Sequence, residues 1–208
     1  WTTALLKARA TEPISRKRLD IGAPTDDGWA PWMSAGADGL LEVLRSTPAQ
    51  QPVWTWGTGR NARWWARRQL HETAVHNADA TLAVGEAYEL DALVAADGIC
   101  ELLDNAPARL AWPDATPSPL DATVHLHATD SDPTTNDPLL ADNGEWMVTM
   151  SDGAVTYSHG HGKGDTAVRG PVTQLMLIMN RRTDPAAPGI ETFGSIDALE
   201  ALITAINH

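Results

Sequence analysis

The feature that most constrains the fold is a change of hydrophobic period on either side of a proline-rich segment. Residues 105–120 contain four prolines, Pro107, Pro113, Pro117 and Pro119. Up to about residue 103 the apolar residues recur with helical spacing, whereas several segments beyond the prolines alternate apolar and polar residues as strands do. A stretch with this many prolines predicts an irregular linker between two differently built parts.

The expected elements follow from these patterns. Helices are expected over residues 36–46, 61–84, 91–103, 170–182 and 195–206. Strands are expected over residues 123–128, 145–150 and 154–159. The order predicts an α+β protein with a helical domain over residues 1–106 and an α+β domain with an antiparallel sheet over residues 120–208.

Composition indicates a soluble globular protein and argues against two kinds of partner. Hydrophobic residues make up 43% of the chain and charged residues 20%, which is ordinary for a packed domain. The formal charge of −12 argues against binding to nucleic acid and to anionic membrane surfaces. No run of eighteen apolar residues occurs, so a membrane-spanning helix is not expected. A monomer or weak homodimer is the expected state.

The single cysteine, Cys100, excludes an internal disulfide and favours the reducing cytoplasm. Because it lies in an apolar helical pattern, we expect it to be a small core residue rather than a nucleophile. The chain begins at Trp1, inside a pattern that resembles a helix already under way. We therefore expect further residues before Trp1.

The expected helix over residues 61–84 carries a polar stripe. On a helical wheel Arg68, Glu72, His76 and Asp79 fall within about 40° of one direction. A glutamate and a histidine four residues apart can reach one cation, and a carboxylate with a neutral imidazole suits Zn²⁺. The same spacing also occurs in ordinary surface pairs, which stabilise a helix by only a few tenths of a kcal/mol.

Other charged residues of this helix leave alternatives open. His71 falls on the apolar stripe, so we expect a packed histidine rather than a metal ligand. Four basic residues gather near the start of the helix: Arg60, Arg63, Arg67 and Arg68. This cluster either steers an anionic substrate or balances Glu72 and neighbouring acids.

Several stretches, taken together, resemble the mycothiol-dependent maleylpyruvate isomerase family. The helix sequence WWARRQLHETAVHNADA at residues 64–80 is the most specific of them, and PVWTWG and LDALVAADGICELL flank it. GPVTQLMLIMNRR at residues 170–182, followed by IETFGSIDALEALI, resembles the family's second domain. The resemblance covers nearly the whole chain in order.

The resemblance implies a DinB-like four-helix bundle joined to a small α+β domain. It implies zinc, or another divalent metal, held by Glu72, His76 and a histidine from an earlier helix that would precede Trp1. It also implies mycothiol as the thiol cofactor, for which Arg68 is the candidate contact. The family's C-terminal arginine best matches Arg182, with Arg181 as the alternative.

A chemistry follows from this implied site. Three protein ligands leave open positions on zinc, where a thiol is deprotonated. Arg182 would hold a substrate carboxylate or developing enolate. Asp79 either orients His76 through its second ring nitrogen or caps neighbouring side chains.

Three functions remain open at this point. The first is a thiol-dependent isomerase or S-transferase acting on a small anionic substrate. The second is a non-catalytic protein that binds a small anion, and the third is a metal-dependent hydrolase.

Histidines in the C-terminal part give weaker signals. His125 and His127 share one face of an expected strand, and His159 and His161 lie beside glycines at and just after the end of the expected strand over residues 154–159. We expect the glycine-flanked pair to lie in a surface loop rather than to bind metal.

Overall fold

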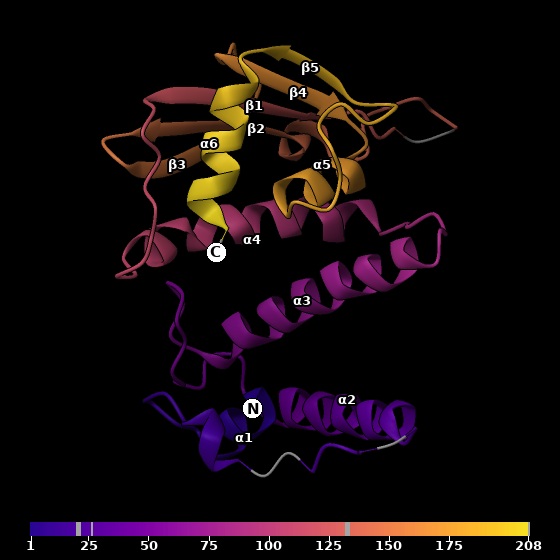
Figure 1. The fold of residues 1–208 in the computed structure, drawn as a ribbon, viewed down its shortest axis with the longest axis vertical. Coiled ribbons are helices and arrows are strands. Elements are labelled where there is room, and N and C mark those ends of the chain that lie inside the picture. The colour runs from indigo at the N-terminus through magenta and orange to yellow at the C-terminus, as the bar shows by residue number, and fades with distance from the viewer. Residues whose placement is uncertain (20–21, 26, 132–133, 208) are drawn as a thin grey trace. The chain divides into compact units, whose positions relative to one another are not determined.

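The computed structural model describes residues 1–19, 22–25, 27–131 and 134–207 (Figure 1). The chain forms two compact units, Trp1–Leu70 and His71–His208. The boundary falls inside one continuous helix, α3 (Ala62–Ala83), so this helix contributes its first turns to one unit and its remaining turns to the other.

The first unit is helical. It contains α1 (Thr2–Lys7), the 3-10 turn η1 (Arg16–Arg18), α2 (Trp29–Ser46) and the start of α3. Its core joins Leu5 and Leu6 of α1, Val43 of α2 and Trp65 of α3. The indole rings hold the irregular segments in place, since Trp1 donates from Nε1 to the Ile14 carbonyl and Trp65 to the Trp54 carbonyl, each over 2.7 Å.

The second unit is a five-stranded sheet covered on one face by helices (Figure 1). The strands are β1 (Ala122–Ala128), β2 (Glu145–Ser151), β3 (Ala154–His159), β4 (Thr166–Gly170) and β5 (Glu191–Gly194), in the order β3-β2-β1-β4-β5. The helices are α4 (Ala92–Leu110), α5 (Val172–Met179) and α6 (Ile196–Ile206), and the 3-10 turn η2 (Ala141–Gly144) precedes β2.

The central strand β1 separates two chemically different faces. Val124 and Leu126 are fully buried and pack into the core together with Val148 of β2 and Val168 of β4. Side chains alternate along a strand, so His125 and His127 point to the opposite face. The helical layer therefore lies on one side of the sheet, and the histidines of β1 lie on the other.

Most expected elements are confirmed, and local chemistry explains them. Asp91 caps α4 by accepting hydrogen bonds from the backbone N–H groups of Leu93 and Val94, at 2.9 and 3.2 Å. The β2–β3 hairpin turns at Asp152 and Gly153, whose φ angles of 51° and 74° belong to the left-handed region that a two-residue hairpin turn requires.

Two strands were not predicted, and one pairing differs from the expected antiparallel sheet. β4 and β5 are only five and four residues long and end in glycine, so neither shows a clear alternating pattern. β1 pairs with β4 in parallel, whereas the other three pairings are antiparallel. α2 begins at Trp29, seven residues before the expected start, and α4 continues through Pro107 to Leu110.

Within the described ranges, no helix combines the length and the apolar character needed to cross a bilayer.

We predict that Asp91→Ala lowers the free energy of unfolding by about 1 kcal/mol, because two N–H groups at the start of α4 lose their side-chain acceptor. Urea denaturation would measure the change. Asp114→Ala, in the exposed turn after α4, is the control and should stay within about 0.5 kcal/mol of the wild type. Equal effects of the two substitutions would contradict the assigned cap.

Candidate functional site

A chain of contacts links Glu72, His76, Asp79 and Arg182 within the second unit. Glu72, His76 and Asp79 follow one another at successive turns of α3, and Arg182 lies just beyond the end of α5. His76 Nε2 lies 3.4 Å from Glu72 Oε2, and His76 Nδ1 lies 3.0 Å from Asp79 Oδ2. Arg182 donates to both Asp79 oxygens, from Nε over 2.9 Å and from Nη2 over 3.1 Å.

Asp79 is the charged centre of this chain of contacts. The hydrogen bond from Arg182 is the main reason that the pKa of Asp79 lies below its usual value; partial burial opposes this shift, and the contact with His76 adds to it. The carboxylate is therefore ionised near neutral pH. Of the two alternatives that the sequence left open for Asp79, the structure has the contact with the second ring nitrogen of His76.

The Asp79 contact decides which nitrogen of His76 carries hydrogen. An ionised carboxylate only accepts hydrogen bonds, so Nδ1 is the donor and Nε2 of the neutral ring keeps its lone pair. Glu72 Oε2 lies 3.4 Å from this Nε2 atom. Two acceptor atoms this close repel each other unless a proton or a metal cation lies between them.

The spacing of Glu72 and His76 fits a shared metal ion. With metal–ligand bonds of about 2.1 Å, two neighbouring ligand atoms of tetrahedral zinc are about 3.4 Å apart. Neither side chain is buried, since Glu72 is 38% and His76 65% exposed. An ion at this position would keep coordination sites that a small molecule can reach.

The arginines predicted from the sequence occupy different surroundings. Arg68 belongs to the first unit, where its guanidinium lies over the Trp56 ring at 5.6 Å from the centroid. Arg181 donates to Thr204 Oγ1 over 3.3 Å. Arg181 and Arg182 both line a pocket of about 610 Å³ together with Asp184, Glu200 and Thr204.

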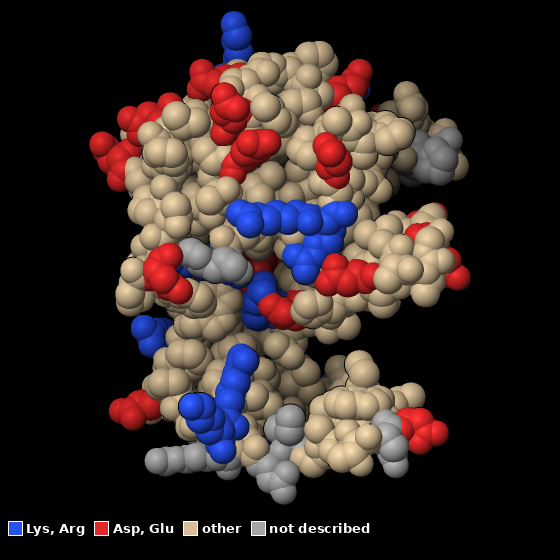
Figure 2. Space-filling view, viewed as in Figure 1, with Lys and Arg blue, Asp and Glu red and all other residues tan. Residues whose placement is uncertain are grey.

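Figure 2 shows how charges are distributed on one face of the molecule. Acidic side chains are spread over the sheet region, whereas basic side chains gather near α5 with acidic ones beside them. Arg182, just beyond the end of α5, pairs with Asp79 over 2.9 Å. An anion that binds near α5 therefore meets arginines whose charges are partly balanced.

His71 is a packed histidine, as predicted from its place on the apolar stripe. It is 5% exposed, and its Nε2 lies 2.7 Å from Asp97 Oδ2 on α4. Gly98 leaves room for the ring, because a Cβ atom there would lie 3.2 Å from His71 Nδ1. His71 therefore fixes α3 against α4 and does not face Glu72 or His76.

A second group of polar side chains lies on the open face of the sheet. It combines His125 and His127 of β1, Glu145 of β2 and His161 of the loop before β4. Glu145 Oε2 is the common partner, at 2.7 Å from His125 Nε2, 2.9 Å from His161 Nδ1 and 3.6 Å from His127 Nδ1. Their ligand atoms all lie within 4.8 Å of one another, which among the described residues is true of no other group of three or more His, Cys, Asp or Glu side chains.

This group is only partly visible in the sequence. His161 is 78% exposed in a loop, as expected, but the loop brings it to Glu145. Glu145 was not predicted as part of the group, because it lies eighteen residues from His127 along the chain. The two residues are nevertheless direct partners across the β1–β2 pair. His159 lies apart from the group, with Nδ1 at 3.1 Å from the Glu145 carbonyl oxygen.

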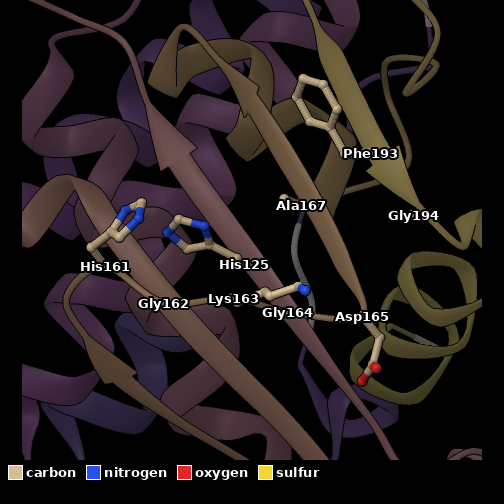
Figure 3. A pocket seen from close by; sticks show the side chains of 9 residues that line it. All are labelled: His125, His161, Gly162, Lys163, Gly164, Asp165, Ala167, Phe193 and Gly194. Atoms are coloured by element: carbon tan, nitrogen blue, oxygen red, sulfur yellow. The ribbon is translucent and has the colours of Figure 1, made fainter.

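A pocket of about 630 Å³ adjoins the second group. Its lining consists of His125, residues 161–165, Ala167, Phe193 and Gly194. Figure 3 shows the His125 and His161 rings close together at one end and the Phe193 ring at another. Imidazole rings therefore line one end of the pocket, and the phenyl ring of Phe193 lines another.

We predict that Arg182→Gln raises the pKa of Asp79 toward the value of a free aspartate, because the main hydrogen bond to the carboxylate is lost. NMR titration of the Asp79 carboxyl carbon would measure the shift. The stabilisation from Asp79 is present above the unfolded-state pKa and is lost as the pH falls through the lower folded-state pKa, so the variant should lose less stability in acid.

Arg169→Gln is the matched control for this titration. Arg169 forms a more exposed ion pair, donating to Glu191 over 2.6 Å, and its partner is not Asp79. It should leave the Asp79 titration unchanged. An unshifted pKa of Asp79 in Arg182→Gln would show that the contact does not persist in solution.

Comparison with known proteins identifies both parts of the chain. Residues 5–81 match the mycothiol maleylpyruvate isomerase N-terminal domain, a helical DinB-like domain, and residues 93–201 match the C-terminal domain of the same family. No curated protein matches the chain.

Two solved structures resemble part of the chain. One is the solution structure of a conserved hypothetical protein from Thermus thermophilus, described as possibly a sterol carrier protein, with 17% identity, a TM-score of 0.33, and 58% of this chain and 89% of that chain covered. The other is a crystal structure of sterol carrier protein 2, with 17% identity, a TM-score of 0.30, and 53% and 86% covered. Because the C-terminal family match alone spans more than half of the chain and the N-terminal match precedes it, the protein belongs to the mycothiol maleylpyruvate isomerase family.

Proposed function

We propose that the protein is a metal-dependent enzyme that uses mycothiol, with zinc as the metal and with Glu72 and His76 as two of its ligands. The observation that carries this proposal is the 3.4 Å separation of Glu72 Oε2 and His76 Nε2. Membership of the family supports the thiol and the isomerase class of reaction. When bound, the metal would supply a positive charge that favours the thiolate form of a thiol.

Asp79 prepares His76 for this role. It accepts a hydrogen bond from Nδ1, which fixes the ring orientation and keeps Nε2 available as the ligating atom. Arg182 in turn holds Asp79 ionised and in place through two hydrogen bonds. The orientation of the imidazole thus depends on a residue just beyond the end of α5.

Arg182 is also the proposed contact for the substrate. A guanidinium carries five N–H groups, and the hydrogen bonds to Asp79 and to the Asn180 carbonyl use three of them. One N–H group remains on each terminal nitrogen, enough to bind a carboxylate through two hydrogen bonds. Arg181, on the same pocket, is the alternative contact.

The reaction that suits these groups acts on a small anion with an activated carbon. Isomerisation of an unsaturated diacid and transfer of a thiol to an activated carbon both need a thiolate, a bound carboxylate and stabilisation of developing negative charge. Arg68, which the Trp56 ring holds by a cation–π contact, is the proposed contact for the thiol cofactor.

Three further properties belong to the proposal. We place the protein in the cytoplasm, because a chain with a single cysteine forms no internal disulfide, and we propose a monomer or weak homodimer. We divide it into a metal-binding domain over residues 1–106 and a C-terminal domain over residues 120–208. The family matches over residues 5–81 and 93–201 support this order of domains.

We predict that Glu72→Gln and His76→Ala each remove one equivalent of zinc from the purified protein. Mycothiol-dependent turnover should fall by more than about 100-fold, since even changes to groups behind a metal ligand cost about 10- to 100-fold. Elemental analysis and a thiol-dependence assay would measure the two effects.

Glu86→Gln, an exposed glutamate just beyond α3, is the control and should change neither quantity. Unchanged zinc content in Glu72→Gln would contradict the metal assignment. The Arg181–Arg182 pocket would then favour the second candidate function, a protein that binds a small anion without catalysis.

A further inference from the structure

The cluster of His125, His127, Glu145 and His161 places three imidazole rings around one carboxylate. One ligand atom of each of the four side chains lies within 4.8 Å of those of the other three. Burial is the main cause that lowers the pKa of His127; Glu145 opposes the shift and Arg169 adds to it. Two of the ring nitrogens, His125 Nε2 and His161 Nδ1, donate to Glu145 Oε2, so a metal ion that binds them would displace the hydrogen that each carries there.

Glu145 is ionised despite its surroundings. Burial alone raises the pKa of this carboxyl, but hydrogen bonds from His161 and His125 outweigh it and bring the pKa below its usual value. Among neighbouring cations, Arg169 pairs with Glu191 rather than with Glu145. The cluster therefore combines one carboxylate with three imidazoles, side chains that bind metals as the carboxylate and as the neutral ring.

The donor set selects a class of ion. Three imidazole nitrogens and one carboxylate oxygen suit Zn²⁺ and similar transition-metal ions, whereas Mg²⁺ and Ca²⁺ require oxygen donors. The distances of 2.7 and 2.9 Å from Glu145 Oε2 to His125 and His161 are shorter than the about 3.4 Å between ligands of tetrahedral zinc. Binding needs these atoms to separate by roughly half an ångström, which the Glu145 side chain and the loop residue His161 can allow.

We infer that these four side chains form a second metal site, for a divalent transition-metal ion of the zinc type, and that the ion fixes the loop over residues 160–165 to the sheet. Four protein ligands complete a tetrahedron and leave no open position, which is typical of a structural rather than a catalytic zinc site. His161 is the outermost ligand, at 78% exposure, so the ion has a path of entry from solvent.

The loop over residues 160–165 needs the metal only at the end that contains His161, because its other end is already bonded to β1. At its other end Asp165 accepts hydrogen bonds from the backbone N–H and the hydroxyl of Thr123, both over 2.8 Å. Gly164 lies so close to β1 that a Cβ atom would come within 3.0 Å of the His125 backbone nitrogen. Between these attachments lie Gly162 and Lys163, which line the 630 Å³ pocket (Figure 3). A metal at His161 would therefore set the shape of that pocket.

Zinc binding to the full chain tests the site. After removal of metal by a chelator, calorimetric titration with Zn²⁺ should lose one binding event in His161→Gln, or show at least about tenfold weaker affinity, because loss of a ligand costs no less than loss of a group behind it. His159→Gln is the matched control, since His159 is an exposed histidine two residues earlier that lies outside the cluster. Equal zinc binding by His161→Gln and the wild type would overturn the inference.

A variant that lacks Glu72 and His76 separates this site from the one in the proposed function. Glu72→Gln combined with His76→Ala should retain one zinc equivalent, and adding His161→Gln should abolish it. If the cluster binds zinc but Glu72 and His76 do not, the Glu72→Gln/His76→Ala variant should bind as much zinc as the wild type. If only Glu72 and His76 bind zinc, His161→Gln should bind as much zinc as the wild type.

Proteolysis tests the role in fixing the loop. Lys163 is exposed and flanked by glycines, so trypsin should cut after it faster in the metal-free protein than in the zinc-loaded protein. The zinc effect should vanish in His161→Gln and persist in His159→Gln. Cleavage at Lys163 that is independent of zinc in the wild type would overturn the structural role.

Discussion

The alternation of side chains along β1 is the constraint on which both candidate sites depend. Val124 and Leu126 must face the core, because they lose all contact with water there. That burial holds α5 and α6 on one side of the sheet and so places Arg182, just after α5, beside Asp79 of α3. It also directs His125 and His127 to the opposite side, where Glu145 lies across from His127. One strand thus positions two groups with different chemistry.

The two sites differ in what they offer a ligand. At Glu72 and His76, two donors lie on the exposed side of a helix, and a third residue, Asp79, holds the ring in orientation. At Glu145, four donors converge from two strands and a loop. An ion bound at the first site would remain accessible, whereas an ion at the second would be held by four ligands. Of the two proposed sites, the first is therefore the better candidate for the binding of a small thiol in the proposed function.

Features that depend on residues close together in the sequence were largely predicted from the sequence. The spacing of Glu72, His76 and Asp79 on one helix gave their mutual contacts, since positions three and four apart are neighbours on a helix. Asp91 marked the start of α4, and Asp152–Gly153 marked the hairpin. The partner of Arg182 was not predictable in this way, because Asp79 lies more than one hundred residues earlier and only the packing of α5 brings them together.

The elements that escaped prediction are those defined by partners far along the chain. β4 and β5 are too short to show alternation, and each is a strand only because its neighbour supplies hydrogen bonds. The same holds for Glu145, whose relation to three histidines depends on the register of β1 with β2 and on the path of the loop before β4. The long helices were predicted, because the apolar spacing that indicates a helix lies entirely within its own segment.

The uneven distribution of tryptophan gives this protein a built-in optical label. Seven of its nine indoles lie in residues 1–70, and five of them (Trp1, Trp54, Trp56, Trp64 and Trp65) touch edge to face or at a tilt. The second unit contains only Trp112 and Trp146. Intrinsic fluorescence therefore reports mainly on the helical N-terminal unit, and the sheet needs a different spectroscopic signal.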